Sequence, residues 1–280
     1  MTNTNIERYH ARHDRAHCLA PGIFRSLRKG RRKSQNLDIT YVFGDLSLRF
    51  VGFQPLGADD MRFLQGIIAL AGPHGLILGS EPTTEAGRQL RLFLDPRLAA
   101  AQQDALVVRS SMLHLLKLVG LTGGGKNIKG LKESLRRMAN VTVYVTKNQQ
   151  EASFHLLSYV FDDNELLVAV NPRIAEAILG RIPHARIEIN EVRELKSDVA
   201  CLIHQWLCAW IDPGEKKHIG LTTIIHYLWE ETENAKTMQK RRQYVRKALA
   251  EFEKIGWKIT EQGGEQYEIA RPKLPEPDTV

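Results

Sequence analysis

Alternating hydrophobic and polar positions near the start of the chain predict a β-hairpin. The apolar positions of this pattern lie on both sides of Gly44-Asp45, a dipeptide typical of turns, and they are Leu37, Ile39, Tyr41, Phe43, Leu46, Leu48 and Phe50. Such alternation places the apolar side chains on one face of a pleated strand. We therefore expect ordered structure to begin at Leu37 with two antiparallel strands.

Helical spacing follows this hairpin. Asp59 and Asp60 precede apolar residues spaced three and four apart, and Gly72-Pro73 ends the pattern, so a helix with a buried face is predicted between them. Two more helices and three short strands follow, and we expect them over residues 110–119, 127–139, 141–145, 154–158 and 166–170. Together these elements form one unit of helices followed by a hairpin.

The second half of the chain repeats this order of elements. Helices are predicted over 197–211, 221–229 and 237–255, and a hairpin that turns at residues 262–264 follows them. The repeat lies in the order of elements and not in residue identity. We interpret the chain as an α+β protein with tandem winged-helix domains, two helical units each followed by a β-hairpin wing. The expected boundaries are 37–171 for the first domain and 172–280 for the second, which holds the main recognition helix.

Residues 1–36 are read as a basic N-terminal arm. Only Glu7 and Asp14 oppose its cations, which are Arg8, Arg12, Arg15, Arg25, Arg28, Lys29, Arg31, Arg32 and Lys33. A solvated tail and an arm that contacts phosphates fit this composition about equally well. If the arm contacts DNA, we expect Arg28, Arg31 and Arg32 to take part.

Composition narrows the class of protein. The 280 residues carry a net charge of +7 despite 32 acidic residues, so the positive charge must be concentrated in local clusters. Three cysteines without CxxC spacing argue against a disulfide framework and a cysteine-rich zinc module, and they fit a reducing cytoplasm. The chain has no apolar run long enough to cross a bilayer, so we expect a cytoplasmic protein without a membrane partner.

The densest basic cluster lies in the last long helix. Its six cations precede the next acid, Glu251, and are Lys236, Lys240, Arg241, Arg242, Arg246 and Lys247. In a helix-turn-helix the second helix enters the major groove, where arginine can bind guanine through two hydrogen bonds. Val245, Leu249 and Phe252 form a separate apolar stripe, so the basic face is directed to solvent or ligand. A solvated helix face is the alternative, but we favour DNA contact and expect Thr237, Gln239 and Gln243 to share in it.

A second basic cluster decorates the helix predicted over 127–139. Glu133 alone opposes its cations, which are Lys126, Lys129, Lys132, Arg136 and Arg137. Several recur at i, i+3 and i+4 spacing on one side of the helix. We expect them to position DNA phosphates in preference to reading bases.

Two motifs resemble catalytic sites but lack essential parts. The stretch from Gly120 to Asn127 resembles a phosphate-binding loop, but Asn127 replaces the Ser or Thr that holds magnesium, and a helix leads into it. Tyr244 to Lys247 resembles the YxxK helix of rolling-circle nickases, but the paired histidines one residue apart that hold their metal are missing. We interpret the first as a glycine turn and Tyr244 as a packing or stacking residue, and we expect no catalysis and no cofactor.

Two groups of histidine and cysteine contain potential metal ligands. His10, His13, His17 and Cys18 fall in the basic arm, where neighbouring cations would oppose a divalent ion. Cys201, His204 and Cys208 share a helical face with apolar residues and have no evident fourth ligand. We therefore expect core packing for the second group and no metal site in the chain.

Several segments resemble the RepC replication initiators of IncQ-type broad-host-range plasmids. The similarity runs over nearly the whole chain and is carried by RHDRAHCLAPGIFR (12–25), PLGADDMRFLQGIIAL (55–70), GRQLRLFL (87–94), HQWLCAWIDPG (204–214) and TMQKRRQYVRKAL (237–249). The resemblance places the basic helix at Lys240, Arg241, Arg242, Arg246 and Lys247. The middle loop varies within the family, so what the resemblance implies applies least securely to residues 120–130.

The resemblance implies a non-enzymatic protein that binds direct repeats, called iterons, in double-stranded DNA at the vegetative origin. It further implies that the protein promotes origin opening for a plasmid-encoded helicase and primase, and it leaves a homodimer open. A winged-helix transcriptional repressor is the alternative from another class, although no ligand pocket or dimerising helix is evident. A rolling-circle nickase is the enzyme alternative.

Overall fold

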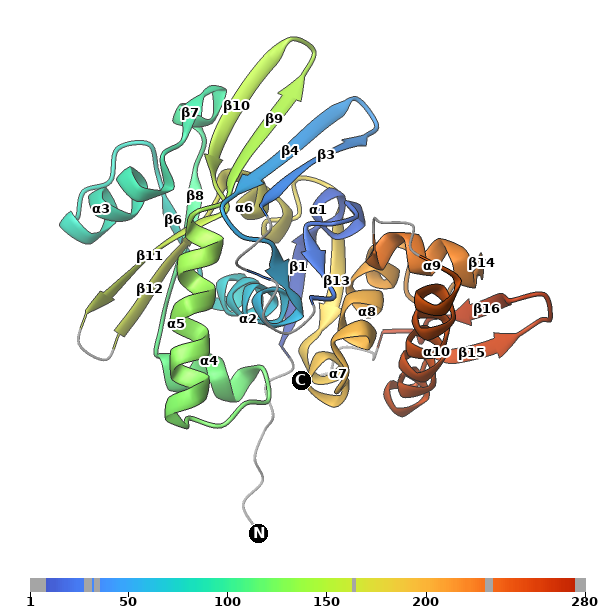
Figure 1. The fold of residues 1–280 in the computed structure, drawn as a ribbon. Helices are drawn as coiled ribbons and strands as arrows, with labels where there is room; N and C mark the ends of the chain where they lie inside the picture. The colour runs from blue at the N-terminus through green and yellow to red at the C-terminus, as the bar shows by residue number, and fades with distance from the viewer. Residues whose placement is uncertain (1–8, 28–31, 33–35, 163–164, 230–233, 275–280) are drawn as a thin grey trace.

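A computed structural model of the chain describes residues 9–27, 32, 36–162, 165–229 and 234–274. These residues form a mixed α+β structure in which helices and largely antiparallel sheets follow one another along the chain (Figure 1). None of the helices in the described ranges is long and apolar enough to cross a membrane. Arg28 and Arg31, two of the expected DNA contacts, lie outside the described residues.

The first unit is built on a long helix and a four-stranded sheet. The helix is α2 (Ala58–His74), and helices α4 (Met112–Leu118) and α5 (Gly125–Ala139) lie beside it. The sheet has the order β11-β12-β8-β6, and its strands are Leu157–Asp162, Glu165–Val170, Ala105–Ser110 and Leu76–Leu78. The predicted helices over 110–119 and 127–139 are thus confirmed within a few residues.

The second unit follows the same plan. Helix α8 (Asp198–Trp210) is followed by β14 (Lys216–Gly220), α9 (Leu221–Leu228) and α10 (Ala235–Glu251), then η3 (Phe252–Ile255). The hairpin β15 (Lys258–Glu261) and β16 (Gln266–Ala270) completes a sheet of order β14-β16-β15. In both units the strand before the second helix pairs with the last strand of the closing hairpin, as β8 does with β12 and β14 with β16.

The hairpin after α5 belongs to a different sheet from the one expected. Strands β9 (Thr142–Lys147) and β10 (Gln150–His155) join the predicted hairpin β3 (Leu37–Phe43) and β4 (Leu46–Gly52), with β7 (Arg97–Leu98) at the edge. The strand predicted over 154–158 is wrong, because the chain changes sheets at Leu156, between β10 and β11. Alternation predicts a strand but does not identify its partner.

The N-terminal segment is part of the core and not a solvated arm over most of its length. Strand β1 (His10–Asp14) pairs with β13 (His184–Glu188), α1 (Arg15–Leu19) follows, and β2 (Phe24–Arg25) pairs with β5 (Leu56–Gly57). Asp14 is buried, and its Oδ2 lies 2.5 Å from Nε of Arg173 in α6 (Pro172–Ile178). This ion pair compensates the buried charge of Asp14.

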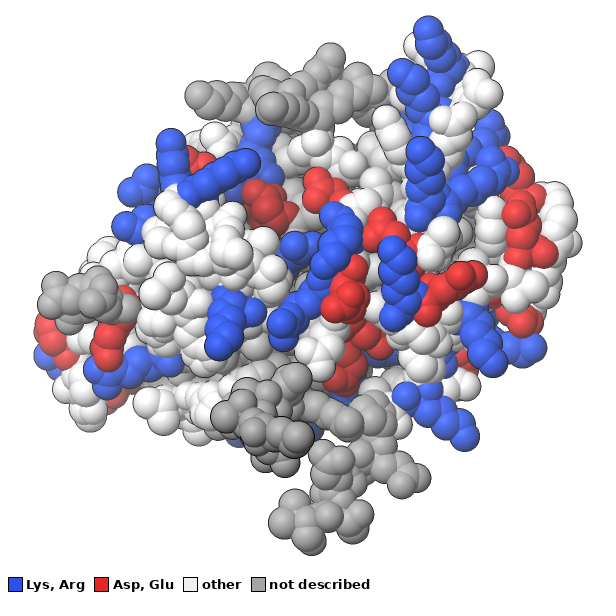
Figure 2. Space-filling model, turned by 90° about the horizontal axis from the view of Figure 1, so that it is seen from below, with Lys and Arg blue, Asp and Glu red and all other residues white. Residues whose placement is uncertain are grey.

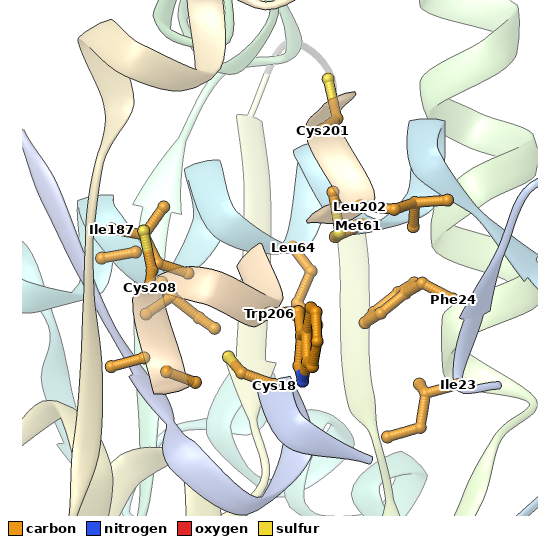
Figure 3. Close-up of a cluster of buried hydrophobic side chains, with 14 of the residues drawn as sticks. Cys18, Ile23, Phe24, Met61, Leu64, Ile187, Cys201, Leu202, Trp206 and Cys208 are labelled. Atoms are coloured by element: carbon orange, nitrogen blue, oxygen red, sulfur yellow. The ribbon is translucent and has the colours of Figure 1, made fainter. Parts of the chain in front are cut away.

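Helix α8 lies at the centre of the molecule and connects the two halves. It packs against α1, α2, α9, α10 and β13, and one continuous core of buried side chains extends across both units. Figure 3 shows Trp206 of α8 between Cys18, Leu64 and Phe24, which come from the first half of the chain. Cys18, Cys201 and Cys208 are all buried free thiols, so the expected packing role of the two cysteines in α8 is confirmed.

The remaining short elements extend the first half. Helix α3 (Glu85–Leu94) and the 3-10 helix η2 (Ala99–Gln102) follow β6, and α7 (Ile189–Glu194) follows β13. Figure 1 shows α3 and β7 at the end of the molecule opposite the hairpin β15–β16.

Candidate nucleic-acid interface

Helix α10 begins at an asparagine cap and presents one apolar and one polar face. The side chain of Asn234 accepts a hydrogen bond from the backbone N–H of Thr237 at 3.0 Å, which satisfies an otherwise unpaired donor. Val245, Ala248 and Leu249 are buried against the unit. The polar face holds exposed side chains, namely Lys236, Gln239, Lys240, Gln243, Tyr244, Arg246 and Lys247.

Arg241 lies on the inward side of α10. Its side chain is only 6% exposed, and the guanidinium carbon lies 5.3 Å from the ring centroid of Trp229, at the end of α9. This contact is a cation–π interaction, which is strengthened when the cation is withdrawn from water. The structure thus separates Arg241 from the other cations of the cluster and gives it a role in joining α9 to α10.

Arg242 and Arg246 are both tied to the closing hairpin by Glu265. Nε of Arg242 and Nη2 of Arg246 lie 3.2 and 3.1 Å from the same oxygen, Oε1 of Glu265. Glu265 has a φ of +62°, so it sits in a turn conformation that few non-glycine residues adopt. One carboxylate therefore pairs with two guanidinium groups, one turn of helix apart, at the surface of α10, and Arg246 also donates a hydrogen bond to it.

The second cluster contains exposed cations and one cation, Arg137, that forms ion pairs within the protein. Lys126, Lys129, Lys132 and Arg136 of α5 are exposed, whereas Leu131, Leu135 and Met138 form its buried stripe. Nζ of Lys132 lies 5.6 Å from the ring centroid of Phe161 in β11. No ion pair within the described residues involves Lys126, Lys129 or Arg136, and these side chains can meet phosphates.

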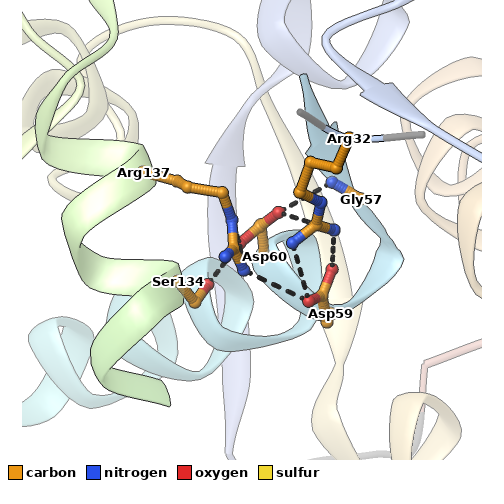
Figure 4. Close-up of polar contacts among 6 residues, drawn as sticks. All are labelled: Arg32, Gly57, Asp59, Asp60, Ser134 and Arg137. Atoms are coloured by element: carbon orange, nitrogen blue, oxygen red, sulfur yellow. Dashed lines mark hydrogen bonds and ion pairs between the residues drawn. The ribbon is translucent and has the colours of Figure 1, made fainter. Parts of the chain in front are cut away.

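Arg137 is committed to the start of α2. Its Nη2 donates to Oδ1 of Asp60 at 2.7 Å and to Oδ2 of Asp59 at 3.2 Å (Figure 4). The hydroxyl of Ser134 donates to the same Asp60 oxygen at 2.5 Å. Asp60 is buried, and although burial and the adjacent Asp59 raise its pKa, the arginine favours the ionised form. Removing one partner of a buried ion pair leaves the other charge uncompensated. We therefore assign Arg137 a role in stabilising the fold.

Arg32 completes this network from the N-terminal segment. Its two terminal nitrogens donate to the two carboxylate oxygens of Asp59 at 3.2 and 2.7 Å. Gly57 lets Arg32 reach Asp59, because a Cβ at that position would collide with the Arg32 guanidinium and the Asp59 carboxylate. Arg32 and Arg137 were expected to contact DNA, but the structure places both on the acid pair that begins α2.

The two helices supply separate basic regions of one face. Figure 2 shows Lys and Arg side chains gathered on the right, over the half with α10 and the β15–β16 hairpin, and on the left, over the half with α5. Acidic side chains, interleaved with further Lys and Arg side chains, lie between these regions. This distribution fits two contacts with a polyanion better than one continuous basic groove.

The glycine-rich stretch is a turn between two helices, as predicted. It connects α4 to α5, and the Asn127 amide donates to the carbonyl oxygen of Thr122 at 2.9 Å and to its hydroxyl at 3.1 Å. The side chain that departs from the phosphate-binding pattern thus fastens its own loop.

His204 of α8 belongs to a buried polar cluster with Glu191 and Cys208. Nε2 of His204 lies 2.6 Å from Oε2 of Glu191 and 3.5 Å from Sγ of Cys208, and the Trp257 indole N–H donates to Glu191 at 3.4 Å. These three groups are the one potential metal-ligand set among the described residues. Two ligands about 2.0–2.2 Å from a tetrahedral zinc ion would be separated by more than 3 Å, so the His204–Glu191 distance corresponds to a charged hydrogen bond.

Comparison with known proteins gives a family and a fold. The family model described as Replication protein C (RepC) matches residues 5–273. No match was found among curated proteins. A crystal structure of SeMet derivatives of domain 2 and domain 3 of RctB superimposes with a TM-score of 0.55 at 11% identity, covering 93% of this chain and 99% of that one. A second structure of RctB domains 2-3 gives 0.54 at 11% identity, covering 92% of this chain and 97% of that one.

Proposed function

We propose, because the chain belongs to the replication protein C family, that it is a plasmid replication initiator that binds iteron repeats in duplex DNA at the vegetative origin. In this proposal the protein has no catalytic role of its own. It promotes origin opening and delivers the opened strands to a plasmid-encoded helicase and primase in the cytoplasm.

The proposed binding modules are two winged-helix domains, one in each half. The shared element order supports this assignment, since α8, β14, α9, α10 and the β15–β16 hairpin follow the same sequence and pairing as α2, β8, α4, α5 and the β11–β12 hairpin. The β9–β10 hairpin is then an insertion between the recognition helix and the wing of the first domain. By this correspondence α10 and α5 are the helices that enter DNA grooves.

Within α10 we divide the side chains by role. Arg242 is the residue that we assign to a guanine edge, because its ion pair with Glu265 places its guanidinium at the surface of α10. The exposed amides of Gln239 and Gln243, together with Thr237, share the groove. The exposed lysines on the same face, Lys236, Lys240 and Lys247, neutralise phosphates.

Within α5 we assign phosphate contact to the exposed cations. Lys126, Lys129 and Arg136 form no ion pair in the described ranges, so DNA binding would not have to break one. Phosphates carry no sequence identity, so this domain contributes affinity and register in preference to base choice.

The observation that carries this proposal is the exposed basic face of α10, on the helix that precedes a closing hairpin. The test is fluorescence anisotropy of the full chain on a duplex iteron and on a scrambled duplex, measured for Lys240→Ala/Lys247→Ala. Affinity for the iteron should fall at least about tenfold, since two phosphate contacts are lost. Arg88→Ala/Arg97→Ala removes the same charge from α3 and β7 and should have little effect. Equal loss in both double variants, or equal affinity of the native chain for both duplexes, would refute the proposal.

A further inference from the structure

A cavity of about 570 Å³ opens between α5 and the turn that joins β4 to β5. The residues around it are polar with one exception, and they are Arg32, Phe53, Gln54, Glu133, Arg136, Arg137 and Asn140. Its volume lies within the range of about 300–1,000 Å³ that is usual for small-molecule sites. The proposed duplex contacts of α10 lie in the other half of the chain and do not line it.

Phe53 is the apolar wall of this cavity. It is 79% exposed, the highest value among the large hydrophobic side chains of the described residues. The preceding Gly52 lets its turn lie close to the end of α5, because a Cβ there would come within 3.2 Å of Val141 Cγ2 and 3.6 Å of the Asn140 carbonyl oxygen. An aromatic ring is thus held in water beside a set of hydrogen-bonding groups.

Three guanidinium groups also line the cavity. Arg32 and Arg137 are held by Asp59 and Asp60, which fixes their guanidinium groups at the edge of the cavity (Figure 4). Arg136 is exposed and has no ion-pair partner within the described ranges. Asp59 and Asp60 neutralise Arg32 and Arg137, so Arg136 is the guanidinium group of the lining that remains to bind an anion.

Two amides stand beside these groups. The side-chain amide nitrogen of Asn140 donates a hydrogen bond to the Arg136 carbonyl oxygen at 2.7 Å. The side-chain oxygen of Asn140 is left as an acceptor. Gln54 is half-buried and offers both a donor and an acceptor. An aromatic face, amide groups and an arginine are the parts that bind the base and the phosphate of one unpaired nucleotide.

We propose that this cavity binds a nucleotide of single-stranded DNA, with its base stacked on Phe53 and its phosphate on Arg136. A base in a duplex is covered on both faces by its neighbours and cannot stack on a protein side chain without leaving the helix. The site therefore adds a second DNA form to the chain's ligands and distinguishes an opened strand from the closed origin. It shares Arg136 with the proposed duplex contacts of α5, but Phe53 has no role in duplex binding, so a change at Phe53 separates the two.

The test is anisotropy with a labelled twelve-residue oligothymidylate and, separately, with the duplex iteron. Phe53→Ala should weaken single-strand binding by about 5- to 150-fold, the loss expected for one stacked base. Phe53→Trp should restore it, and duplex affinity should change less than twofold in both variants. Phe93→Ala removes another exposed phenylalanine, 56% exposed on α3, and should change neither affinity.

Three results would overturn the proposal. They are absence of oligothymidylate binding by the native chain, retention of full binding by Phe53→Ala, and equal weakening of single-strand and duplex binding. The duplex titration reports on the proposed origin binding by itself, so failure of one proposal is distinguishable from failure of the other. Because Phe53 lies at the surface, its replacement leaves the core of the chain intact.

Discussion

The amide of Gln65 in α2 donates a hydrogen bond to the side-chain oxygen of Gln205 in α8 at 2.9 Å, in the buried interface between the two halves. Each glutamine is the eighth residue of its helix, counted from Ala58 and from Asp198, and the two are 0% and 1% exposed. Since α2 and α8 are the first helices of the two similar units, equivalent positions of the repeat meet each other. The pair sets the register in which the two helices pack.

Removal of one glutamine from this pair should destabilise the chain. Gln65→Leu leaves the Gln205 amide buried without its partner, which costs about 1–3 kcal/mol in the free energy of unfolding. Gln65→Leu/Gln205→Leu removes both polar groups and should regain part of that loss. Urea denaturation of the four chains gives the coupling energy. As a control, Ser158→Ala, which removes a buried hydrogen bond to the Leu90 carbonyl, should combine additively with Gln205→Leu.

The His204–Glu191 pair should make stability depend on pH on the alkaline side. Burial opposes a charged imidazole, but Cys208 and Glu191 favour it and raise the pKa of His204 to about 10. Because this pKa is higher in the folded chain than in the unfolded one, the stabilisation is complete below about pH 6.5 and is lost as the pH rises toward 10. The free energy of unfolding should fall by up to about 1.4 kcal/mol per pH unit in this window.

Urea denaturation from pH 6 to 10 measures this effect, with His204→Gln as the comparison. The variant should be less stable at pH 6 and should lack the histidine contribution to the alkaline slope. His114, an exposed histidine for which no ion pair is found in the described part of the chain, provides the control His114→Gln, which should keep the native slope. Parallel curves for the native chain and His204→Gln would show that His204 is not charged in the fold.

Glu265 should control how selectively α10 binds DNA. Glu265→Gln removes the carboxylate charge that fixes Arg242 and Arg246, so both side chains gain freedom and the local potential becomes more positive. Affinity for scrambled duplex should rise while the ratio of iteron to scrambled affinity falls by about threefold or more, because an unfixed arginine loses directional preference. Competition titrations measure the ratio. Glu268→Gln, in the same hairpin but paired with Lys216, should leave that ratio unchanged.

The sequence predicted local structure well because its signals were local. The apolar stripe through Val245 and Leu249 locates α10, and the glycines at 263 and 264 adopt the positive φ values that their turn requires. Asp59 and Asp60 lie in the first turn of α2, as their pattern predicts. These features depend on neighbours within a few residues, which periodicity and turn chemistry describe.

What the sequence did not reveal depends on partners far along the chain. The acids at the start of α2 hold Arg137, more than 70 residues away, and no spacing rule indicates this. Arg241 resembles its neighbour Arg242 in every sequence property, yet Trp229 withdraws it from the surface. The N-terminal strand β1 is ordered because β13 accepts it, although its composition is that of a tail. The sequence gives no sign of the polar cavity at Phe53 beyond an aromatic residue next to Gly52.

The central claim is that α10 reads sequence through Arg242, and competition against iterons substituted one base pair at a time tests it most directly. Arg242→Ala should cost about 1–3 kcal/mol of binding and remove the preference at a single position. Lys129→Ala should weaken binding to every duplex alike, and Arg241→Ala should lower the unfolding free energy while the base preference of the folded fraction persists. If Arg242→Ala weakens all duplexes equally while Lys129→Ala alters preference at one position, sequence is read by the first domain and the account is wrong.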